Sequence, residues 1–480
     1  MHEAHEDDAQ AARRIAWIVG AAFFMETLDS MIIATALPAM ARSFGTTPLQ
    51  MSQGITAYLV AMAAFAPAAG WSAERFGARR MFVGAIAAFT GASVLCGLAP
   101  SPATFFAARA LQGAAAALMS PVGRFVVLRE TPKQRLIEAI GTITWPGLIG
   151  PVVGPVLGGL IVEHASWRWA FFLNLPLGMI GAWLVMRFFP LRKPGHPQAL
   201  DLRGFLLNAT ALGAIVQGLS LLGERQGEGI AVPLSVLAFG LAAGALALRH
   251  AARAQAPMLD LRVLRVRSFR MANATAGFLS RVAIHASPFL LPLMLQVGMG
   301  MSPLDAGTAM LVYMAGNLLM KAVTTPVLRR YGFRTVLTVN GAICALTLVA
   351  CGTLVPDTPT TLLYGCLLAA GLSRSLNFTA IATLAFADVP DEQRANATGL
   401  STMLQQLAIS MGVAFAALAL GLSQSMRDAG SLQMADFRHA WFAAGALMAL
   451  AALVARRLDH DAGAAIYALR SGGRCPPPAR

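Results

Sequence analysis

Apolar segments long enough to cross a membrane recur along this chain from one end to the other. A helix needs about 20 predominantly apolar residues to span the hydrocarbon core of a bilayer. Because that core offers no water to backbone polar groups, such segments are expected to be α-helices. The sequence therefore predicts an all-α polytopic membrane protein. Fourteen segments fit, at residues 15–37, 51–73, 80–98, 104–128, 137–162, 168–190, 203–222, 231–249, 270–297, 303–327, 335–355, 360–386, 395–424 and 438–456.

The composition agrees with this fold class. Charged residues make up 12% of the chain, whereas soluble globular domains contain roughly 25%. The net charge of +14 does not indicate a nucleic-acid partner, because the basic residues fall in short loops between the apolar segments. No cleavable signal peptide is expected, since the first segment carries Glu26 and Asp29 and no small-residue cleavage site follows it. The five cysteines have no paired spacing, so no metal and no cofactor is predicted.

The basic residues also predict the orientation in the membrane. Loops rich in arginine and lysine alternate with loops that carry few, and the richer set is expected on the cytoplasmic side. Both termini then lie in the cytoplasm, as an even number of spans requires, and the bacterial cytoplasmic (inner) membrane is the expected location. The richer set contains Arg75, Arg79, Arg80, Arg129, Lys133, Arg135, Arg192, Lys193, Arg203, Arg253, Arg262, Arg265, Arg267, Arg329, Arg330, Arg334 and Arg394.

A short internal repeat divides the chain. The pattern Arg-aromatic-Gly-x-Arg follows the second span at 75–79 and the tenth at 330–334, and a Pro-containing polar loop ending in arginine follows the fourth and the twelfth. Spans one to six therefore correspond to spans nine to fourteen, as in transporters built from two parallel repeats. The predicted parts are a cytoplasmic, disordered tail (1–14), a six-helix bundle (15–190), a linker (191–202), an inserted helix pair (203–249), a basic cytoplasmic linker (250–269), a second six-helix bundle (270–456) and a cytoplasmic, disordered tail (457–480).

Five motifs occur in order at the expected spans. The chain carries an acidic run at 28–38, a Gly-to-Arg loop at 70–80, an Arg-x-x-Gln-Gly at 109–113, a Gly/Pro-rich run at 150–159 and a Trp-rich run at 167–176. Together they resemble the major facilitator superfamily, in particular the fourteen-span drug:proton antiporters of the EmrB/QacA type. The resemblance implies two six-helix bundles that rock about a central site, with two inserted helices. Glu74 and Ala78 depart from the usual loop pattern, which implies a weaker cytoplasmic gate.

Two carboxylates in the first span are the strongest functional signal. Charged groups at membrane depth usually face a cavity and mark an ion or substrate path. Asp29 and Glu26 are three residues apart, so they share a helix face. We expect them to hold one shared proton for which substrate competes, although a carboxylate kept only for packing is the alternative. Arg109 is predicted to pair with one of them or with backbone carbonyls, in a coupling or a structural role.

Two further sets follow from glycines, prolines and charges. Small residues let helices approach closely and prolines bend them, so the fifth span is predicted to be a hinge and seal between the halves. The loop after the second span resembles a salt-bridge gate, or else reflects ordinary topology. The hinge set is Gly150, Pro151, Gly154, Pro155, Gly158 and Gly159, and the gate set is Gly70, Glu74, Arg75, Gly77, Arg79 and Arg80.

The second half carries basic side chains inside its spans. Arg281, Lys321 and Arg374 lie on three helices at similar depth, with His285 and Asn377 close by in sequence. They are predicted to form one positive wall of the substrate cavity, opposite the first-span carboxylates, unless Arg281 and Lys321 snorkel to the interface. Such a wall favours an anionic or zwitterionic substrate, or an internal ion pair between the halves.

The combined reading is a proton-coupled efflux antiporter for small amphiphilic drugs or metabolites. A proton symporter or uniporter of an anionic or zwitterionic metabolite is the alternative with the same fold. An intramembrane enzyme or receptor is disfavoured because the zinc-protease, nucleophile-elbow and P-loop motifs are absent from the sequence. Its expected partners are protons, a small molecule and the lipid bilayer. A monomer is expected, and the short outer loops offer little surface to a periplasmic adaptor.

Overall fold

The computed structural model describes residues 2–131, 136–190, 200–223, 229–254, 260–390, 393–427 and 431–463. Every regular element in these ranges is a helix. The first half contains α1 (His2–Phe44), α2 (Pro48–Phe65), α3 (Ala68–Phe76), α4 (Ala78–Leu98), α5 (Pro102–Glu130), α6 (Leu136–His164), α7 (Trp169–Phe172) and α8 (Asn174–Phe188). Then follow α9 (Leu202–Gly223), α10 (Ala231–Arg253), η2 (Leu261–Arg265), α11 (Arg267–Asn273), α12 (Ala276–Leu293), η3 (Met294–Gly298), α13 (Pro303–Thr353), α14 (Thr360–Ala387), α15 (Arg394–Met426) and α16 (Met434–Ala455).

The number of helices fits the predicted number of spans. Within the described ranges, 12 helices are long and apolar enough to cross a membrane, and the pair α2–α3, bent by 61°, would supply a thirteenth. Helix α13 has 51 residues and is broken at Gly332. At about 1.5 Å per residue it is far longer than one bilayer core of about 30 Å, so its two arms are two spans. The structure thus agrees with the predicted all-α fold of fourteen spans.

The internal repeat has a structural cause in two glycines. Gly77 has φ 87° and separates α3 from α4, while Gly332 has φ 72° and breaks α13 at the same position of the repeated pattern. A side chain at positive φ is strained, so glycine is the residue suited to such a turn. The two loops therefore turn the chain in the same way in both halves.

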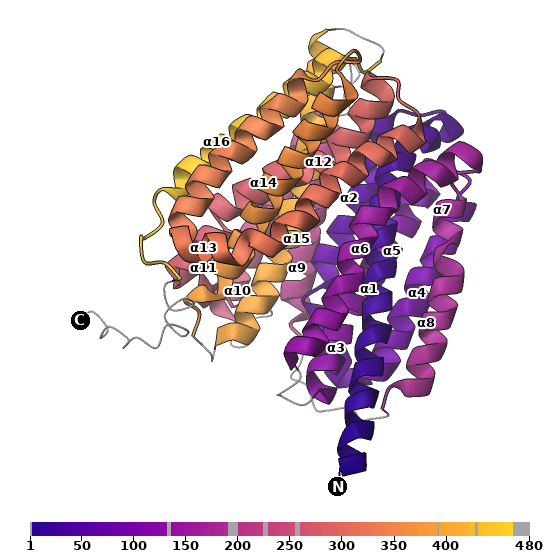
Figure 1. Ribbon diagram of the computed structural model, residues 1–480, viewed down its shortest axis with the longest axis vertical. Coiled ribbons are helices and arrows are strands. Elements are labelled where there is room, and N and C mark those ends of the chain that lie inside the picture. Colours follow the sequence, from indigo (N-terminus) through magenta and orange to yellow (C-terminus); the bar gives the residue numbers. More distant parts are fainter. Residues whose placement is uncertain are drawn as a thin grey trace.

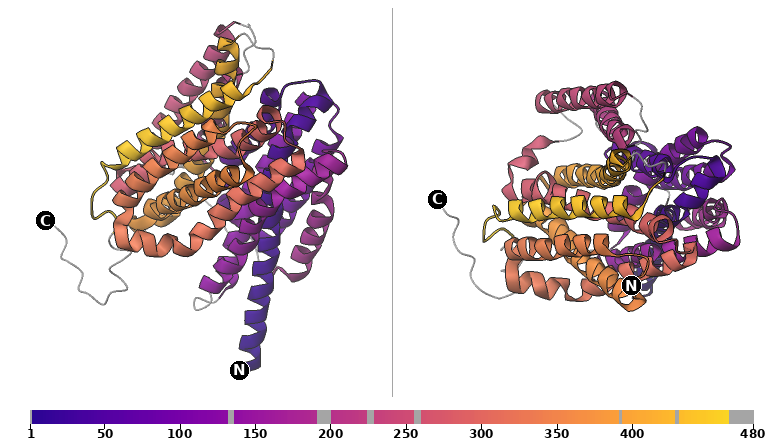
Figure 2. Two further views of the ribbon diagram at one scale, coloured as in Figure 1. Left: turned by 45° about the horizontal axis from the view of Figure 1, so that its top comes forward. Right: turned by 90° about the horizontal axis from the view of Figure 1, so that it is seen from above.

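Two six-helix groups lie side by side in Figure 1, α1–α8 on the right and α11–α16 on the left. They meet where α1 ends, at the top of the view, and their ribbons diverge towards the end where α1 begins (Figures 1 and 2). At this joined end Gln296 Nε2 donates to Thr35 O at 3.0 Å, and the Leu304 amide donates to the Glu163 carboxylate at 3.1 Å. One large buried apolar cluster there includes side chains of both halves. A smaller buried cluster joins Ala63, near the end of α2, to Phe269 and Ala397 of the second half, on the flank where α2 meets α15.

The inserted pair α9–α10 lies outside the two groups, at the edge of the molecule seen from above (Figure 2). Helix α9 contacts α2, where the rings of Phe65 and Phe205 are 5.2 Å apart, and α15, where Gly421 lies directly against the backbone of Gly223. Helices α2 and α15 also touch beneath it. The pair therefore lies across the boundary between the halves on this flank.

The ends of the chain differ in part from the sequence prediction. Helix α1 begins at His2, so residues 2–14, predicted to be a disordered tail, belong to this helix. Residues 191–199 and 464–480 lie outside the described residues, and they make up most of the predicted linker (191–202) and of the predicted C-terminal tail (457–480).

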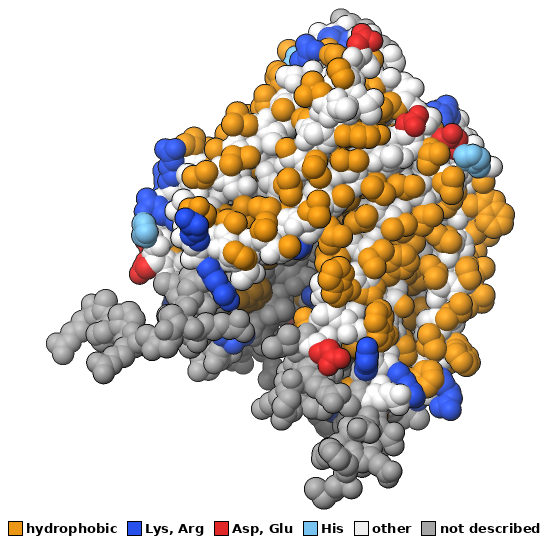
Figure 3. Space-filling model, in the orientation of Figure 1, with side chains coloured by type: hydrophobic (Ala, Val, Ile, Leu, Met, Phe, Trp, Pro, Cys, Tyr) orange, Lys and Arg blue, Asp and Glu red, His pale blue; other side chains and the backbone are white. Residues whose placement is uncertain are grey.

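The surface has the pattern of a membrane protein. In the face shown in Figure 3, apolar side chains cover the middle of the molecule, and the charged side chains gather towards its two ends. Large apolar residues such as Trp145, Trp183 and Phe239 are more than half exposed. A broad exposed apolar belt of this kind is expected where lipid, not water, is the neighbour.

Candidate substrate and proton site

A cavity of about 220 Å³ lies between the two halves. Helices α1, α2, α5 and α6 line it from the first half, and α12, α14 and α15 from the second. Its acidic and basic side chains are Glu26, Arg109, His285 and Arg374. The full lining is Glu26, Thr27, Ser30, Met31, Ala34, Ile55, Tyr58, Leu59, Met62, Arg109, Pro151, His285, Pro288, Phe289, Arg374, Gln406, Ile409 and Val413.

Asp29 does not line this cavity; its carboxylate is engaged inside the first bundle. Arg109 Nη1 lies 2.7 Å from Asp29 Oδ2, Gln112 Nε2 donates to Oδ1 at 3.0 Å and Asn174 Nδ2 donates to Oδ1 at 2.8 Å. Asp29 is 3% exposed. Because three donors from α5 and α8 occupy the carboxylate, a substrate in the cavity reaches it only if this network breaks.

Arg109 is the centre of the same network and is fully buried. Its Nη1 also donates to Gln112 Oε1 at 2.6 Å, its Nε donates to Gly54 O at 3.4 Å, and the guanidinium carbon lies 4.3 Å from the centre of the Tyr58 ring. The structure therefore pairs Arg109 with Asp29, one of the two partners predicted from the sequence. A buried ion pair with so many additional hydrogen bonds is the arrangement in which burial of both charges is tolerated.

Glu26 has a different environment from Asp29. It lines the cavity, is 7% exposed, and its carboxylate accepts a hydrogen bond from Ser120 Oγ. Within the described part of the chain it forms no ion pair, and no hydrogen bond joins it to Asp29. The structure does not support the predicted sharing of one proton by the two carboxylates. Glu26 is the carboxylate that faces the cavity, and Asp29 is held within the bundle.

Asn174, Gln112 and Ser120 are site residues that the sequence analysis did not single out. Gln112 and Asn174 lie within the sequence motifs at 109–113 and 167–176. Their polar side chains inside apolar segments were the signal by which they could have been identified. Ser120 lies eleven residues beyond Arg109 on α5, at a position that faces α1 by a spacing of close to three helical turns.

The predicted positive wall is wrong in two of its three members. Arg281 is 1% exposed and donates to Ala272 O at 2.9 Å and to Asn273 Oδ1 at 3.1 Å, at the C-terminal end of α11. Basic side chains satisfy the last carbonyls of a helix in this way. Lys321 Nζ donates to Thr379 Oγ1 at 3.0 Å and does not line the cavity. Both cations serve helix packing, because partners inside the second bundle were available to them.

Arg374 and His285 are the two members of this set that line the cavity. Arg374 lies 5.7 Å from the centre of the Tyr313 ring, and among the described residues its guanidinium has no hydrogen-bond or ion-pair partner. His285 Nδ1 lies 2.7 Å from Arg281 O, and since a carbonyl only accepts, Nδ1 carries a proton and Nε2 is left for another partner. Asn377 is fully buried outside the lining, with no partner for either amide atom within the described chain.

The predicted gate residues do not form an ion-pair cluster. Gly77 turns the chain between α3 and α4, and Arg79 donates to the carbonyl of Met186 on α8. Among the described residues, no ion pair joins Glu74 to Arg75, Arg79 or Arg80. Gly70 has open space at its Cβ position. In this arrangement of the halves the predicted salt-bridge gate is not formed.

The predicted hinge residues hold α6 against α1 in its own half and against α13 in the other half. Gly150, Gly154 and Gly158 face α1 at one-turn intervals, and a Cβ at Gly154 would lie 2.8 Å from Met31 Cβ. On the other side, Gly159 lies against the backbone of Pro303 and Leu304 at the start of α13. Helix α6 continues without interruption through Pro151 and Pro155. The glycines therefore act as expected from their size, by permitting close contact at the joined end.

Alanine at Gly159 is expected to loosen the joined end. The added Cβ would lie 2.9 Å from Leu304 Cα, a distance that backbone atoms do not tolerate; overpacking of this kind costs typically 1–3 kcal/mol. Spin labels at Arg42 and Asp357, one in each half, should show a longer mean distance in Gly159→Ala. Alanine at Gly141 on the same helix meets nothing within 4 Å and is the matched control. An unchanged distance in Gly159→Ala would show that this contact does not hold the halves together.

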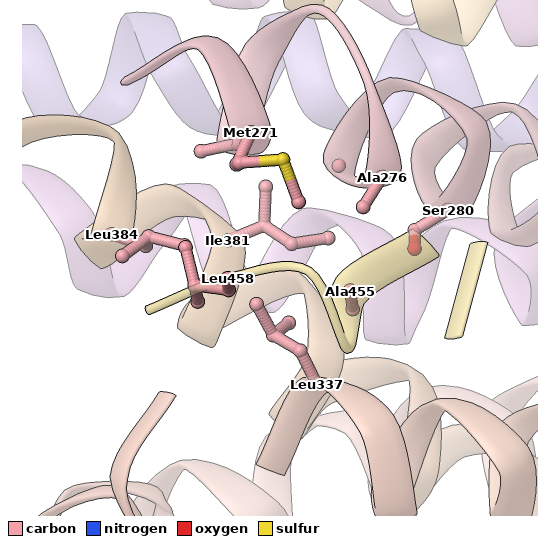
Figure 4. Close-up of a pocket in the computed structure, with 10 residues that line it drawn as sticks. Met271, Ala276, Ser280, Leu337, Ile381, Leu384, Ala455 and Leu458 are labelled. Atoms are coloured by element: carbon pink, nitrogen blue, oxygen red, sulfur yellow. The ribbon is translucent and has the colours of Figure 1, made fainter. Parts of the chain in front are cut away.

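A second pocket, within the C-terminal half, is not a candidate site. It measures about 10 Å³ and is lined mainly by apolar side chains such as Met271, Leu337, Ile381 and Leu384 (Figure 4). Its only polar side chain is Ser280, and it contains no charged group. A space of this size and lining suits ordinary packing between α11, α12, α13, α14 and α16.

The fold and the cavity together define a class of protein. Two repeated helical bundles around a central cavity, in a chain that could cross a membrane many times, are the architecture of a secondary transporter. The sequence profile of the Major Facilitator Superfamily matches residues 19–413. The chain therefore belongs to the major facilitator superfamily, and it is a multi-pass membrane transporter.

Individual relatives agree with this assignment. MdtD of Escherichia coli strain 536, named as a candidate multidrug resistance protein, is 36% identical over 452 residues, which are 93% of this chain and 94% of that protein. This supports the predicted resemblance to the drug:proton antiporter branch. The crystal structure of a D-xylose–proton symporter has TM-score 0.66 at 13% identity and covers 95% of this chain and 99% of its own. A POT family transporter in complex with 5-aminolevulinic acid has TM-score 0.67 at 12% identity, with 94% and 95% covered. At such low identities these structures show the fold alone.

Proposed function

We propose that this protein is a proton-coupled antiporter that exports small amphiphilic molecules by rocking of its two halves. The observation that carries the proposal is the carboxylate of Glu26, which lines the cavity between the halves. A carboxylate in a largely apolar cavity binds either a proton or a cationic group of a substrate, and binding of one opposes binding of the other. Such competition couples two opposite fluxes.

The larger of the cores that the halves share lies at one end, so rocking about that end would alter access to the cavity. We propose that the divergent end faces the cytoplasm, with both termini, in the cytoplasmic membrane of a bacterium. The arginines around α3–α4, such as Arg75 and Arg79, and around the break in α13, such as Arg330 and Arg334, lie at that end, and cytoplasmic loops carry an excess of basic residues. The described state is then open to the inside and closed at the outside.

In this scheme the Asp29–Arg109 pair positions the exchanging acid. Its hydrogen bonds join α1 to α5 and α8, and Asn174 extends the network to Ser93 on α4 at 2.9 Å. Glu26 lies one turn earlier on the same helix, so the network sets its depth and orientation in the cavity. Asp29 and Arg109 therefore support coupling as positioning residues, and the proton exchanges at Glu26.

Everted membrane vesicles with an acid interior provide the test. Substrate added outside would enter an everted vesicle in exchange for protons, and the pH gradient would fall; a symporter would not respond in this way to substrate outside. Cationic, zwitterionic and anionic compounds are added in turn, and vesicles without the protein are the control. Loss of the gradient that requires the protein supports antiport. No compound-dependent loss in any class would contradict the proposal.

A further inference from the structure

The two walls of the cavity carry opposite charges that form no ion pair with the described residues. Glu26 on α1 accepts one hydrogen bond, from Ser120; Arg124 on α5 interacts with it electrostatically, but no cation of the described chain forms an ion pair with it. Arg374 on α14 faces the same cavity with no hydrogen bond and no ion pair in the described part of the chain. The third charge of the lining, Arg109, is already neutralised by Asp29.

We propose that the substrate of this cavity is a zwitterionic amphiphile, whose ammonium group binds Glu26 and whose carboxylate binds Arg374. The inference rests on the proposed function of the same cavity and goes further by naming the substrate class. Charges removed from water are costly unless they are paired and hydrogen-bonded. A molecule with both charges would satisfy both walls at once and would leave neither side chain alone.

The groups around each charge suit the ligand that it would take. Ser120 occupies one oxygen of Glu26, and the second oxygen accepts no hydrogen bond from the described residues, so it is free for an ammonium group. The guanidinium of Arg374 offers a planar fork of donors that matches a carboxylate. Tyr313 lies 5.7 Å beneath that guanidinium, and His285 has Nε2 unengaged in the same lining. In a neutral His285 ring with Nδ1 protonated, Nε2 is an acceptor, so the donors for a carboxylate come from Arg374.

The rest of the lining is apolar and fits the body of an amphiphile. Ile55, Leu59 and Met62 come from α2, and Ile409 and Val413 come from α15. Pro288 and Phe289 complete this surface. Pockets that bind small molecules are mostly apolar with a few placed polar groups, which describes this cavity well.

Molecules with a single charge fit less well for a simple electrostatic reason. A cation would leave Arg374 unpaired and would share the cavity with a like charge. An anion would leave Glu26 unpaired and would likewise share the cavity with a like charge. Either mismatch leaves one charge of the cavity without a partner, and this lowers the affinity before any transport step.

Three probes with one common body test the inference by direct binding. They are 4-(4-aminobutyl)benzoate, which carries both charges, 4-phenylbutylamine, which carries the cation, and 4-butylbenzoate, which carries the anion. Binding of each is measured to the full chain in lipid nanodiscs by scintillation proximity, without a pH gradient. The expected result is that the zwitterion binds roughly 10- to 100-fold more tightly than either single-charge probe, the range for hydrogen bonds to charged groups.

Variants assign the preference to the two walls. Arg374→Gln should lower the affinity for the zwitterion to that for 4-phenylbutylamine. The affinity for 4-phenylbutylamine itself should stay the same or rise. Arg374→Lys should restore part of the preference. Lys321→Gln is the matched control, since that cation is in the same half, donates to Thr379 and lies outside the lining; it should change the affinities by less than about threefold. Because Arg374 has no bonded partner in the described chain, its variants should unfold at the wild-type temperature.

Two results would overturn the inference and leave antiport standing. One is the absence of tighter zwitterion binding, including the case in which none of the probes binds. The other is that Arg374→Gln lowers the affinity for all three probes equally. This would indicate that Arg374 forms an ion pair with Glu26 when the inner end closes. The vesicle measurement fails separately, when no compound of any class dissipates the gradient, so the two proposals can be judged apart.

Discussion

Glutamine in place of Glu26 should abolish proton-driven export and leave the protein folded. The amide oxygen of glutamine still accepts the hydrogen bond from Ser120 Oγ, so the local packing is preserved. The side chain no longer takes up or releases a proton, and the competition between proton and substrate is lost. In everted vesicles, substrate added to Glu26→Gln should leave the pH gradient at the level of vesicles without the protein.

Counterflow separates a loss of coupling from a loss of transport. Exchange of labelled for unlabelled substrate across the membrane needs alternating access but no net proton movement. Glu26→Gln should keep exchange of an anionic or neutral analogue, and Asp357→Asn, in an exposed loop, should behave as wild type in both assays. A variant Glu26→Gln that still dissipates the gradient would remove Glu26 from the coupling step.

Breaking the Asp29–Arg109 pair should destabilise the protein strongly. Removing one partner of a buried ion pair leaves an uncompensated charge and costs about 3–5 kcal/mol. In Asp29→Asn the Arg109 guanidinium would lose its counter-charge while remaining fully buried. The expected result is a lower thermal unfolding temperature in detergent and a lower yield, in contrast with Glu26→Gln, which should unfold close to wild type.

A double-mutant cycle makes this prediction specific. Asp29→Asn combined with Arg109→Gln removes both charges, so the double variant should be more stable than the sum of the two single losses implies. Additive losses would mean that the two side chains act independently. An Asp29→Asn protein that unfolds like wild type but has lost proton coupling would identify Asp29 as the residue that exchanges the proton, as the sequence alone suggested.

Much of the fold is predictable from local patterns in the chain. The length of each apolar segment sets the helices, and the Arg-aromatic-Gly-x-Arg repeat locates the two equivalent turns at Gly77 and Gly332. These signals are local, because a helix and its glycine turn depend on neighbours in sequence. The pairing of Arg109 with the first span was also foreseeable, since a buried arginine requires an acid.

Which of the two neighbouring carboxylates, Glu26 or Asp29, lines the cavity was not predictable in the same way. Glu26 and Asp29 are three residues apart, which places their side chains about 60° apart around the helix. That angle is enough for one to line the cavity and the other to face α5 and α8, and only the packing of α1 decides which. The sequence pattern gave Asp29 the greater weight, and the geometry gives it to Glu26.

The second half shows the same limit at Arg281. The segment 270–297 reads as one uninterrupted span, but the structure ends α11 at Asn273 and begins α12 at Ala276. This break creates unsatisfied carbonyl groups, and Arg281 binds one of them at Ala272. Nothing in the apolar pattern indicates the break, so Arg281 looked like a cavity residue as much as Arg374 did.

The position of α9 bears on how a compound can reach the cavity. It crosses the boundary between α2 and α15, with Phe205 against Phe65 at one level and Gly223 against Gly421 at another. On this flank, protein lies where membrane lipid would otherwise touch the boundary. A compound dissolved among the acyl chains therefore has no direct path there, and arrival from the aqueous phase at the divergent end is the route left on this side. Molecules that partition poorly into oil are favoured by such a route, and a molecule with a full charge at each end is among the poorest partitioners of its size.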